Sequence, residues 1–372
     1  MRFSAVILCE PDSSTQCIAG LLVIDRLVVA AHRAGAENII LVSEKTLPRL
    51  KRTVALGIAV KSAERCPELT GPTLVMSTRL LVQPGDLKRL MVRGGRLTGR
   101  DGTRLPAGVL TEFSGGTLED QLSTLPAVAA EGVAEPITNS ASAATAARVL
   151  WASLTSSTDG FVDKHFNRPV GRWLSKILVH TSVSPNQVSV VSILLGLVSA
   201  WLFARGNYRA ALWGAMLLQV SAIVDCVDGD LARALFKESR LGKWLDIVGD
   251  QVVHISVFVS IGIGLYRAGN GAPVLLLAAS AGTGVVISFV IVMRGLLRPE
   301  DQRNTPLQKL IDATTNRDFS VLLIVLVLLD KLPWFLWMTA IGVHVFWLLA
   351  LGVQLLNQPV VVTLNPDREN RP

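Results

Sequence analysis

The sequence has little charge and few cysteines, and each shortage excludes a class of protein. Only 17% of its 372 residues are charged, whereas soluble domains average about a quarter. Half of the residues are hydrophobic, so a wholly soluble protein is excluded. The four cysteines, Cys9, Cys17, Cys66 and Cys226, have neither paired nor metal-like spacing. Neither a disulfide framework nor a zinc site is therefore indicated.

The N-terminus also lacks the pattern of an export signal. The apolar run at residues 3–9 is followed at once by Glu10 and Asp12, and no cleavage site is apparent. We therefore expect residues 3–8 to be a buried strand of a cytoplasmic domain. The net charge of +7 suggests an anionic partner. Lipid head groups and cytoplasmic loops account for this charge as well as nucleic acid does, and we expect membrane lipid and no nucleic acid.

Residues 1–135 alternate short strand patterns with helical ones. The candidate strands are residues 3–8, 38–42, 58–60 and 73–76. The clearest helical pattern covers residues 18–34, and Gly35 is placed to end it. This order predicts an α/β domain with a doubly wound parallel sheet. Residues 127–147 are rich in Ala, Ser and Thr, which indicates a linker or a loosely packed helix, and we place the linker at residues 136–158.

A basic amphipathic helix is predicted at residues 161–179, just before the apolar runs begin. Its apolar and ring-bearing positions are Phe161, His165, Val170, Trp173, Leu174 and Ile177, and its basic ones are Lys164, Arg168, Arg172 and Lys176. Such a helix suits an anionic membrane surface. The alternative is a soluble helix of the first domain.

Six apolar segments follow and predict an all-α membrane domain at residues 159–357, with a cytoplasmic tail at 358–372. The segments are residues 188–204, 210–224, 245–266, 274–293, 319–329 and 334–356. A span needs about 20 residues, so the fifth helix must extend upstream through Arg317 and Asp318.

The basic residues of the connecting loops set the orientation. The loops after the second and fourth spans contain nine lysines and arginines, whereas those on the opposite side contain four. The excess of positive charge marks the cytoplasmic side. We therefore expect a multi-pass protein of the cell membrane whose N-terminal domain and C-terminus are cytoplasmic.

Four carboxylates on the second and third spans carry the chemistry. Asp225 and Asp228 are three residues apart, and Asp246 and Asp250 four apart, so each pair shares a helical face. A carboxylate in hydrocarbon costs roughly 2.5–3.5 kcal/mol, so the four should face a shared cavity that holds cations. Oxygen ligands without a nearby His or Cys at matching spacing select Mg²⁺, Mn²⁺ or Ca²⁺. Two such ions would clamp a pyrophosphate.

The residues around the carboxylates fit the same chemistry. Gly229 would let a ligand approach the backbone, and Arg233 offers a planar fork of donors for phosphate oxygens. A carboxylate outside the metal shell could accept the proton of an attacking hydroxyl. Asp230 lies inside the same stretch, and we expect it to be solvated; one turn beyond Asp250, we expect His254 to be a satisfied core histidine. The alternative for the whole cluster is an ion-conducting or purely structural group of acids.

The complete spacing resembles the signature of the CDP-alcohol phosphotransferase family. Eight positions within 26 residues match it: D-x2-D-G-x2-A-R-x8-G-x3-D-x3-D, from Asp225 to Asp250. The resemblance covers about residues 159–357, and it implies transfer of a substituted phosphate from a CDP-alcohol to an acceptor hydroxyl with release of CMP. It also implies roles for the matching residues: Asp225, Asp228 and Asp246 as metal ligands, Asp250 as general base and further metal ligand, and Asp225, Gly229, Ala232, Arg233 and Gly242 as the nucleotide pocket.

The N-terminal domain resembles the sugar-phosphate nucleotidyltransferase fold, through residues 18–26, 34–36 and 39–42. Active members have a Gly-rich basic loop after the first strand, which holds a triphosphate. Here residues 10–17 contain no Gly, Arg or Lys, and Ser77-Thr78 replaces a metal-binding Asp. We therefore expect this domain to be inactive, and the membrane domain to work without it.

These observations predict a membrane-embedded, CDP-alcohol-dependent transferase with Mg²⁺ or Mn²⁺ as cofactor. Its acceptor would be a polar or phosphorylated alcohol, and its donor a lipid or soluble CDP-alcohol. Arg317, on the side of the metal site, could bind an anionic acceptor group, or it could pair locally with Asp318. Small residues four apart at 278/282 and 280/284 fit packing within the bundle or a homodimer equally well. The alternative functions are a bifunctional cytidylyltransferase and phosphotransferase, and a non-enzymatic cation transporter.

Overall fold

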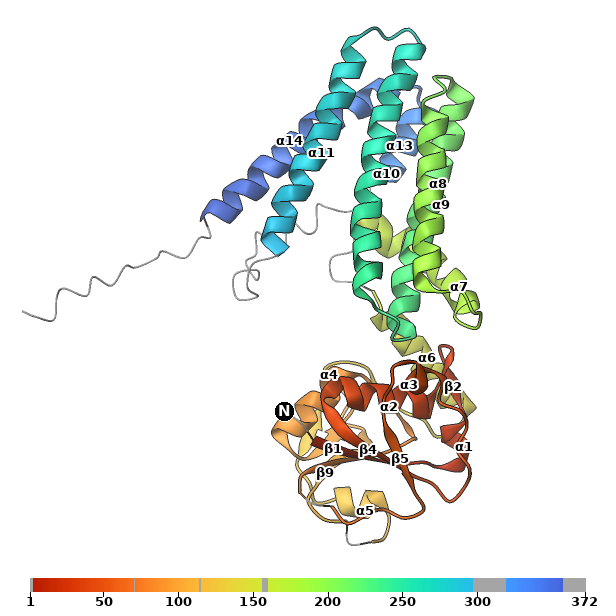
Figure 1. Ribbon diagram of the computed structural model, residues 1–372, viewed down its shortest axis with the longest axis vertical. Helices are drawn as coiled ribbons and strands as arrows, with labels where there is room; N and C mark the ends of the chain where they lie inside the picture. Colours follow the sequence, from red (N-terminus) through yellow and green to blue (C-terminus); the bar gives the residue numbers. More distant parts are fainter. Residues whose placement is uncertain (1–2, 70, 114, 156–159, 297–318, 357–372) are drawn as a thin grey trace, which may run out of the picture. The chain divides into compact units, whose positions relative to one another are not determined.

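The protein consists of a sheet domain and a helical region. The structure is a computed structural model that describes residues 3–69, 71–113, 115–155, 160–296 and 319–356 (Figure 1). The chain divides into two compact units, which are described separately. The first comprises Met1–Thr155, Arg172–Pro185 and Val227–Ser239, and the second Ser156–Gly171, Asn186–Cys226 and Arg240–Pro372. The first unit thus includes the segment that follows Cys226 in the carboxylate motif.

A seven-stranded sheet forms the centre of the first unit. Its order is β10-β8-β9-β6-β1-β4-β5. The strands are β1 (Phe3–Leu8), β4 (Ala36–Val42), β5 (Val60–Ala63), β6 (Thr73–Ser77), β8 (Arg96–Thr98), β9 (Arg104–Leu110) and β10 (Ala127–Ala129). The strands predicted at residues 3–8, 38–42 and 73–76 are confirmed. The strand predicted at 58–60 lies instead at Val60–Ala63, where it pairs with β4 from Ile39 to Val42.

The sheet is mixed, so the prediction of a parallel sheet holds only for part of it. Strand β1 pairs in parallel with β4 and β6, but β9 runs antiparallel between β6 and β8. Only residues 99–103 connect β8 to β9. A connection that short can join antiparallel strands, whereas a parallel pair needs a crossover of a dozen or more residues.

Helices cover both faces of the sheet (Figure 1). Helices α2 (Val23–Ala34) and α4 (Pro84–Arg93) lie on one face, and α5 (Leu118–Leu122) packs on the other, where Leu118 and Leu122 join a core with strand residues of β1, β6 and β9. Helix α2 begins later than predicted, because a small hairpin of β2 (Cys17–Ile18) and β3 (Leu21–Leu22) precedes it. Its predicted end is confirmed: Gly35 caps α2 with a φ of 112°, a conformation that suits glycine.

Residues 127–153 contain two short strands and a helix. Strand β11 (Ala134–Pro136) pairs with β7 (Leu80–Val82), and helix α6 (Ser140–Ser153) follows. The side chain of Asn139 caps α6 by accepting a hydrogen bond from the Ser142 amide. Helix α6 contacts β11 and β2 and buries Leu150 and Trp151. The small residues that indicate a loose segment therefore belong to a helix packed within the first unit. The remaining short helices are α1 (Pro11–Ser14) and α3 (Lys51–Ala55).

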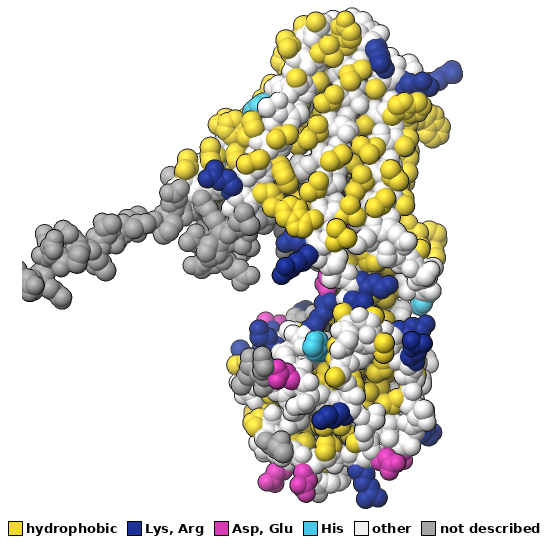
Figure 2. Space-filling view, viewed as in Figure 1, with side chains coloured by type: hydrophobic (Ala, Val, Ile, Leu, Met, Phe, Trp, Pro, Cys, Tyr) yellow, Lys and Arg dark blue, Asp and Glu magenta, His cyan; other side chains and the backbone are white. Residues whose placement is uncertain are grey.

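Among the described residues of the helical region, five helices are long and apolar enough to cross a membrane. They are α8 (Pro185–Phe203), α9 (Tyr208–Ala234), α10 (Arg240–Arg267), α11 (Pro273–Leu296) and α14 (Leu332–Leu356). Large hydrophobic side chains cover much of its visible surface (Figure 2). The protein is therefore a multi-pass membrane protein. A shorter apolar helix, α13 (Phe319–Leu328), occupies the place of the predicted fifth span, whose expected extension through Arg317 and Asp318 lies outside the described residues.

Small residues bring neighbouring helices of this region close together. Helix α11 packs against α10 and α14. A Cβ atom on Gly262 of α10 would lie 2.3 Å from the Cβ of Ala278, and one on Gly284 would lie 2.4 Å from a methyl of Val343 in α14. The small residues of α11 are thus used for packing within the bundle. A homodimer remains a prediction.

The predicted amphipathic helix is present before α8. It consists of a π-helical turn (Asp163–Asn167) and α7 (Arg168–Leu178). The apolar side chains of Phe161, Trp173 and Ile177 are exposed, whereas Ser175 is buried. An exposed apolar stripe beside basic residues is typical of a helix at a membrane surface.

A buried polar network ties the π-helical turn to the bundle. The Gln219 side chain in α9 donates a hydrogen bond to Asn167 Oδ1 at 2.5 Å, and its Oε1 accepts one from Ser320 Oγ of α13 at 2.8 Å. Asn167 Nδ2 in turn donates to Asp163 Oδ1 at 2.7 Å. Each partner satisfies a group that would otherwise be costly to bury in an apolar bundle.

We predict that Gly264→Ala destabilises the helical region. A Cβ atom at this position of α10 would lie 2.1 Å from the carbonyl oxygen of Phe203 in α8, and a backbone oxygen has little room to move. Overpacking of this kind costs about 1–3 kcal/mol, so the thermal unfolding midpoint in detergent should fall by several degrees. The matched control is Gly342→Ala in α14, where a Cβ meets no atom within 4 Å. Equal midpoints for the two variants would contradict the packing described here.

Candidate functional site

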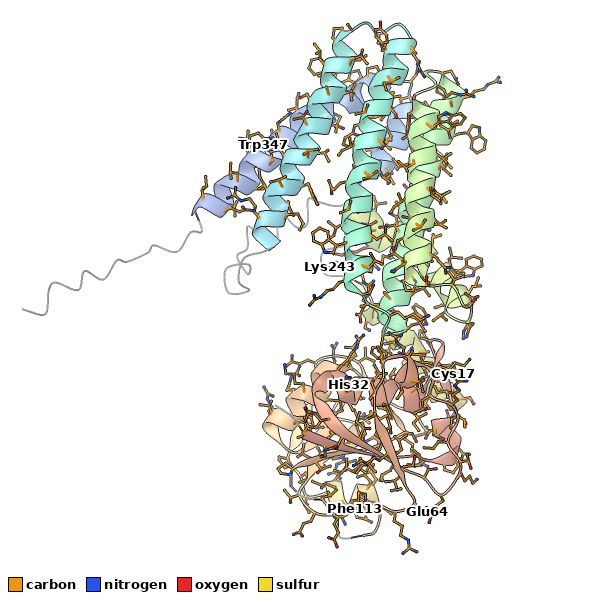
Figure 3. The ribbon with its side chains drawn as sticks, viewed as in Figure 1. Cys17, His32, Glu64, Phe113, Lys243 and Trp347 are labelled. Carbon is orange, nitrogen blue, oxygen red and sulfur yellow. The ribbon has the colours of Figure 1, made fainter. Side chains whose placement is uncertain are left out.

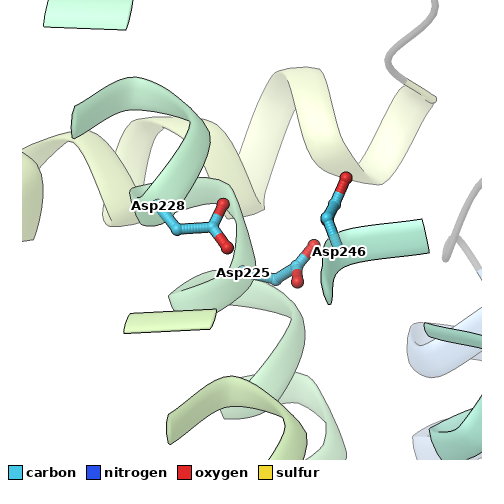
Figure 4. A group of neighbouring side chains, drawn as sticks. All are labelled: Asp225, Asp228 and Asp246. Carbon is cyan, nitrogen blue, oxygen red and sulfur yellow. The ribbon is translucent and has the colours of Figure 1, made fainter. Parts of the chain in front are cut away.

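Helices α9 and α10 bring three of the four predicted carboxylates together. Asp225 and Asp228 project from α9 and Asp246 from α10 (Figure 4). One carboxylate oxygen of each lies within 4.8 Å of those of the other two. The i, i+3 spacing on α9 gives both side chains one face of the helix, as the sequence predicts.

The surroundings of the three carboxylates differ. Asp228 is buried, Asp225 is half-buried and Asp246 is exposed. Asp225 Oδ1 accepts a hydrogen bond from Ser192 Oγ of α8 at 3.1 Å. Ser221 of α9 donates a hydrogen bond to the backbone carbonyl of Ser192 at 2.7 Å, which holds α8 against α9 at this level. Ser192 is not recognisable as a site residue from the sequence, because no motif marks a serine on a neighbouring helix.

The donor set of this cluster fits a hard divalent cation. All three groups are carboxylates, and neither a His nor a Cys belongs to the cluster among the described residues. Oxygen-only sites suit Mg²⁺ or Mn²⁺ rather than zinc. Three negative charges within 4.8 Å also repel one another strongly in a partly buried place, and a bound cation removes this repulsion.

The fourth carboxylate, Asp250, lies outside this cluster and lines a cavity. It follows Asp246 by one turn of α10, and both residues line a cavity of about 650 Å³ in the second unit. The other lining residues come from α10, α11, α13 and α14 and are mostly apolar: Ile247, Gln251, His254, Phe258, Val285, Ser288, Phe289, Val292, Met293, Phe319, Thr339, Gly342, Val343, Val345, Phe346 and Leu349. A carboxylate site thus opens onto a space with hydrocarbon walls.

The expectation that His254 is a satisfied core histidine is wrong. Its ring lies edge-on to Phe319, with the centroids 5.1 Å apart, and near-parallel to Phe258. Its Nε2 atom is buried, and so is Ser288 Oγ, and neither has a hydrogen-bond partner among the described residues. Both residues line the cavity, so they are polar groups available to a ligand there.

Asp230 is buried, which corrects the expectation that it is solvated. Its side chain has no exposed surface, and its Oδ1 accepts a hydrogen bond from Arg233 Nη2 at 3.1 Å. The two residues are three apart on α9, a spacing that allows a salt bridge. This i, i+3 pair of opposite charges was the signal in the sequence that could have identified the contact.

Gly229 makes room for the Arg233 side chain. A Cβ atom at position 229 would lie 3.2 Å from both terminal nitrogens of the guanidinium. The glycine therefore lets the arginine fold back along α9 toward Asp230. The Ala232 carbonyl accepts the amide of Lys237 at 2.8 Å as α9 ends, and Gly242 lies in the first turn of α10. The nucleotide-binding roles of these residues remain predictions, and Arg317, the candidate acceptor residue, lies outside the described residues.

In the sheet domain, the two segments that depart from the nucleotidyltransferase pattern lie side by side. Strands β1 and β6 pair in parallel, so Glu10 and Ser77-Thr78 follow neighbouring strand ends. Ser77 Oγ donates to Glu10 Oε1 at 2.7 Å, and Arg79 Nε forms an ion pair with Glu10 Oε2 at 2.5 Å. Thr78 Oγ1 contacts Ser13 Oγ at 2.8 Å. These polar groups bond to one another, and the sequence analysis missed Arg79 as a positive charge beside Glu10.

A family model agrees with the helical region. Residues 182–347 match the model described as CDP-alcohol phosphatidyltransferase. This range contains all eight positions of the signature from Asp225 to Asp250. It also contains the three clustered carboxylates and the residues described for the cavity up to Phe346.

Several curated proteins are similar to parts of this chain. A "Bifunctional IPC transferase and DIPP synthase" of Thermococcus kodakarensis is 41% identical over 95 residues, which are 26% of this chain and 21% of that protein. A protein of the same name from Aquifex aeolicus is 35% identical over 107 residues, 29% of this chain and 24% of that protein. A "Phosphatidylinositol phosphate synthase" of Streptomyces avermitilis is 32% identical over 116 residues, 30% of this chain and 46% of that protein.

The chain thus spans less than half the length of these relatives. A crystal structure of Mycobacterium tuberculosis phosphatidylinositol phosphate synthase with CDP-DAG bound covers 50% of this chain and 93% of that one, at 17% identity and a TM-score of 0.40, too distant a likeness to argue from. The signature residues and the matched family model together identify the C-terminal part of this chain as a CDP-alcohol phosphatidyltransferase domain.

Proposed function

We propose that this protein is a membrane-embedded CDP-alcohol phosphotransferase. It would move a substituted phosphate from a CDP-alcohol to an acceptor hydroxyl and release CMP. The observation that carries the proposal is the cluster of Asp225, Asp228 and Asp246, whose carboxylate oxygens lie within 4.8 Å of one another at signature positions of the matched family. A cation transporter would also use clustered acids, but it would have no need of Gly229 and Arg233 beside them.

Two divalent ions, Mg²⁺ or Mn²⁺, would be held by Asp225, Asp228 and Asp246. When bound, such ions neutralise phosphate charge and polarise the phosphorus that is attacked. The protein's own contribution is to keep the ligands in place: Ser192 Oγ donates to Asp225, and burial restricts Asp228. A positioned ligand set avoids reorganisation during the reaction.

Asp250 would act as the general base. It lines the same cavity as Asp246, one turn further along α10, and it is not one of the three clustered carboxylates, so an acceptor in this cavity would lie near it. The acceptor oxygen would attack the phosphorus of the substituted phosphate, its proton would pass to Asp250, and the bond from this phosphorus to the CMP oxygen would break. General bases of this kind typically contribute 10²–10⁴-fold to a rate.

The nucleotide would lie on the α9 side of the cluster. Arg233 presents a guanidinium fork that suits phosphate oxygens, and Asp230 holds one of its nitrogens at 3.1 Å. Gly229 leaves space for the arginine. Ala232 has only a methyl side chain and Gly242 has none, so both would leave room for a nucleotide. Asp225 would contact the nucleotide as well as the metal.

The cavity beside Asp250 favours a substrate with a hydrocarbon part. Most of its walls are apolar, and it lies among helices that are long enough to span a membrane. A lipid CDP-alcohol donor fits this surrounding better than a soluble one does. A relative named for phosphatidylinositol phosphate favours an inositol-containing phosphorylated acceptor. Arg317 remains our candidate for an anionic acceptor group. The excess of positive charge in the loops after the second and fourth spans supports a cytoplasmic location for the site and the N-terminal domain.

The second candidate function is a bifunctional enzyme that also has cytidylyltransferase activity. Relatives from Thermococcus kodakarensis and Aquifex aeolicus are named bifunctional, which favours this alternative over an inactive N-terminal domain. Their matches cover only 26% and 29% of this chain, so neither match is long enough to include both the sheet domain and the helical region. Against it, Glu10 is a negative charge at the strand end where a triphosphate would lie.

We predict that CMP release requires a divalent cation. Excess chelator should abolish the release from a CDP-alcohol, and added Mg²⁺ or Mn²⁺ should restore it, because three clustered carboxylates bind such ions through oxygen alone. CDP should inhibit the reaction competitively, an effect that a cation transporter would lack. Full activity in a preparation shown to be metal-free would refute the metal site.

Two neighbouring acids should give different kinetic defects. Asp228→Asn should lower kcat by about 10²-fold or more and weaken metal binding, because a charged ligand is lost. Asp230→Asn should keep metal binding and raise the KM for the CDP donor about tenfold, because Arg233 loses its charged partner. The control is Glu64→Gln, at an exposed position of the sheet domain (Figure 3). Identical defects in the two aspartate variants would mean that the ligand assignment is wrong.

CTP turnover distinguishes the two candidate functions. The full chain incubated with CTP, Mg²⁺ and polyol phosphates, inositol phosphates among them, should release no pyrophosphate if Glu10 excludes the triphosphate. Release that continues in Asp228→Asn but stops in Arg79→Glu, which removes the positive charge beside Glu10, would assign a live cytidylyltransferase to the sheet domain.

A further inference from the structure

Three arginines of the sheet domain bind the segment that directly follows the motif residue Arg233. Arg26 and Arg33 lie on α2, and Arg52 lies in α3. The segment, residues 234–238, ends α9 and belongs to the same compact unit as the sheet domain. His32, the neighbour of Arg33, is labelled on α2 in Figure 3.

Helix α9 ends in a conformation that glycine normally supplies. The Lys237 amide donates to the Ala232 carbonyl at 2.8 Å, and the Phe236 amide to the Arg233 carbonyl at 3.4 Å. These are the two hydrogen bonds of a Schellman motif, whose left-handed position is usually glycine. Here the position is Phe236, with a φ of +54°. A bulky side chain in this region is strained, and surrounding contacts must hold it.

The arginines supply contacts to the carbonyls at this helix end. Arg26 Nη2 donates to the Ala234 carbonyl at 2.8 Å. The Phe236 carbonyl accepts from Arg52 Nη2 at 2.6 Å and from Arg33 Nη2 at 2.9 Å. Carbonyls at a helix C-terminus lack partners within the helix, and cations are favourable there because the helix dipole is negative at that end.

The ring of Phe236 is also held by charge. The guanidinium carbon of Arg33 lies 4.8 Å from the ring centroid, and that of Arg26 lies 5.7 Å away, both within the range of cation–π attraction. Arg33 Nη1 forms an ion pair with Glu238 Oε2 at 2.5 Å. These contacts therefore hold Phe236, the left-handed residue, and Glu238, two positions after it.

The arginines are themselves fixed within the sheet domain. Arg26 is 3% exposed, and its Nε donates to the Ile18 carbonyl at 2.7 Å. Burial lowers the pKa of Arg26 to about 10, so its guanidinium still carries a charge at neutral pH. The buried Asp25 carboxylate accepts hydrogen bonds from the Arg52 and Thr53 amides, both at 2.8 Å, which anchors α3 to α2.

We propose that Arg26, Arg33 and Arg52 are positioning residues of the phosphotransferase. By holding Phe236 in its left-handed conformation they fix the end of α9, and with it the guanidinium of Arg233 that would bind the CDP phosphates. The sheet domain is then a required part of nucleotide binding, whether or not it turns over CTP. This inference rests on the proposed function, and it replaces the expectation that the membrane domain works without its N-terminal partner.

The test uses the full chain and measures CDP binding by titration calorimetry beside steady-state kinetics. Arg33→Ala should weaken CDP binding and raise the KM for the CDP donor about five- to tenfold, while the KM for the acceptor and the affinity for Mg²⁺ stay unchanged. Arg33→Lys keeps the charge, so its defect in CDP affinity should be about half that of Arg33→Ala on a logarithmic scale. The control is Arg93→Ala, an exposed arginine at the end of α4, which should bind CDP as the wild type does.

A second substitution separates positioning from general stability. Glycine adopts the left-handed conformation without support. The double variant Arg33→Ala/Phe236→Gly should therefore recover most of the CDP affinity that the single Arg33→Ala variant loses. An Arg33→Ala variant that binds CDP like the wild type would overturn the proposal, and so would a double variant no better than the single one. A wild-type protein that neither binds CDP nor releases CMP would instead refute the proposed function.

Discussion

The placement of several carboxylates among apolar helices is the constraint on which the rest of the helical region depends. Asp225, Asp228 and Asp246 come within 4.8 Å of one another, and such a cluster is stable in a low-dielectric place only when cations and hydrogen bonds compensate it. Neighbouring helices contribute a hydrogen bond to the cluster and the close approach that permits it. Ser192 donates to Asp225, and a Cβ atom on Gly249 of α10 would clash with Ile193 of α8 at 2.3 Å, so a glycine permits the close approach of these helices.

The sequence predicts the helices of this region well, because a membrane leaves few backbone conformations open to a long apolar segment. Apolar runs must be helices, since unpaired backbone groups are not tolerated in lipid, and helical phase then gives the faces of Asp225 and Asp228. Helical phase does not say which neighbour covers the remaining faces. Asp230 is therefore predicted as solvated although it is buried against Arg233, and His254 is predicted as satisfied although its Nε2 has no partner among the described residues.

The sheet domain is predicted less completely, because its strands depend on pairings between distant residues. The buried strands β1, β4 and β6 are recognisable from short apolar runs, and Gly35 marks the end of α2. The antiparallel β9 is not recognisable, since its burial depends on β6 and β8 rather than on an apolar pattern of its own. In the same way α6 has an alanine- and serine-rich sequence, and only its contacts with β11 and β2 distinguish it from a loose segment.

The end of α9 is held by residues of the sheet domain. A helix that carries signature carboxylates in its last turns has unsatisfied carbonyls near them, and Phe236 adds strain where glycine would relieve it. Contacts between residues about 200 positions apart, from Arg26 to Ala234 and from Arg33 to Phe236, satisfy these groups. No local pattern could have predicted them. Under the proposed function, they would give the sheet domain a physical role at the phosphotransferase site that requires neither a Gly-rich loop nor a metal-binding aspartate. A domain that departs from the nucleotidyltransferase pattern at Glu10 and Ser77 would then still be needed for the chemistry of its neighbour.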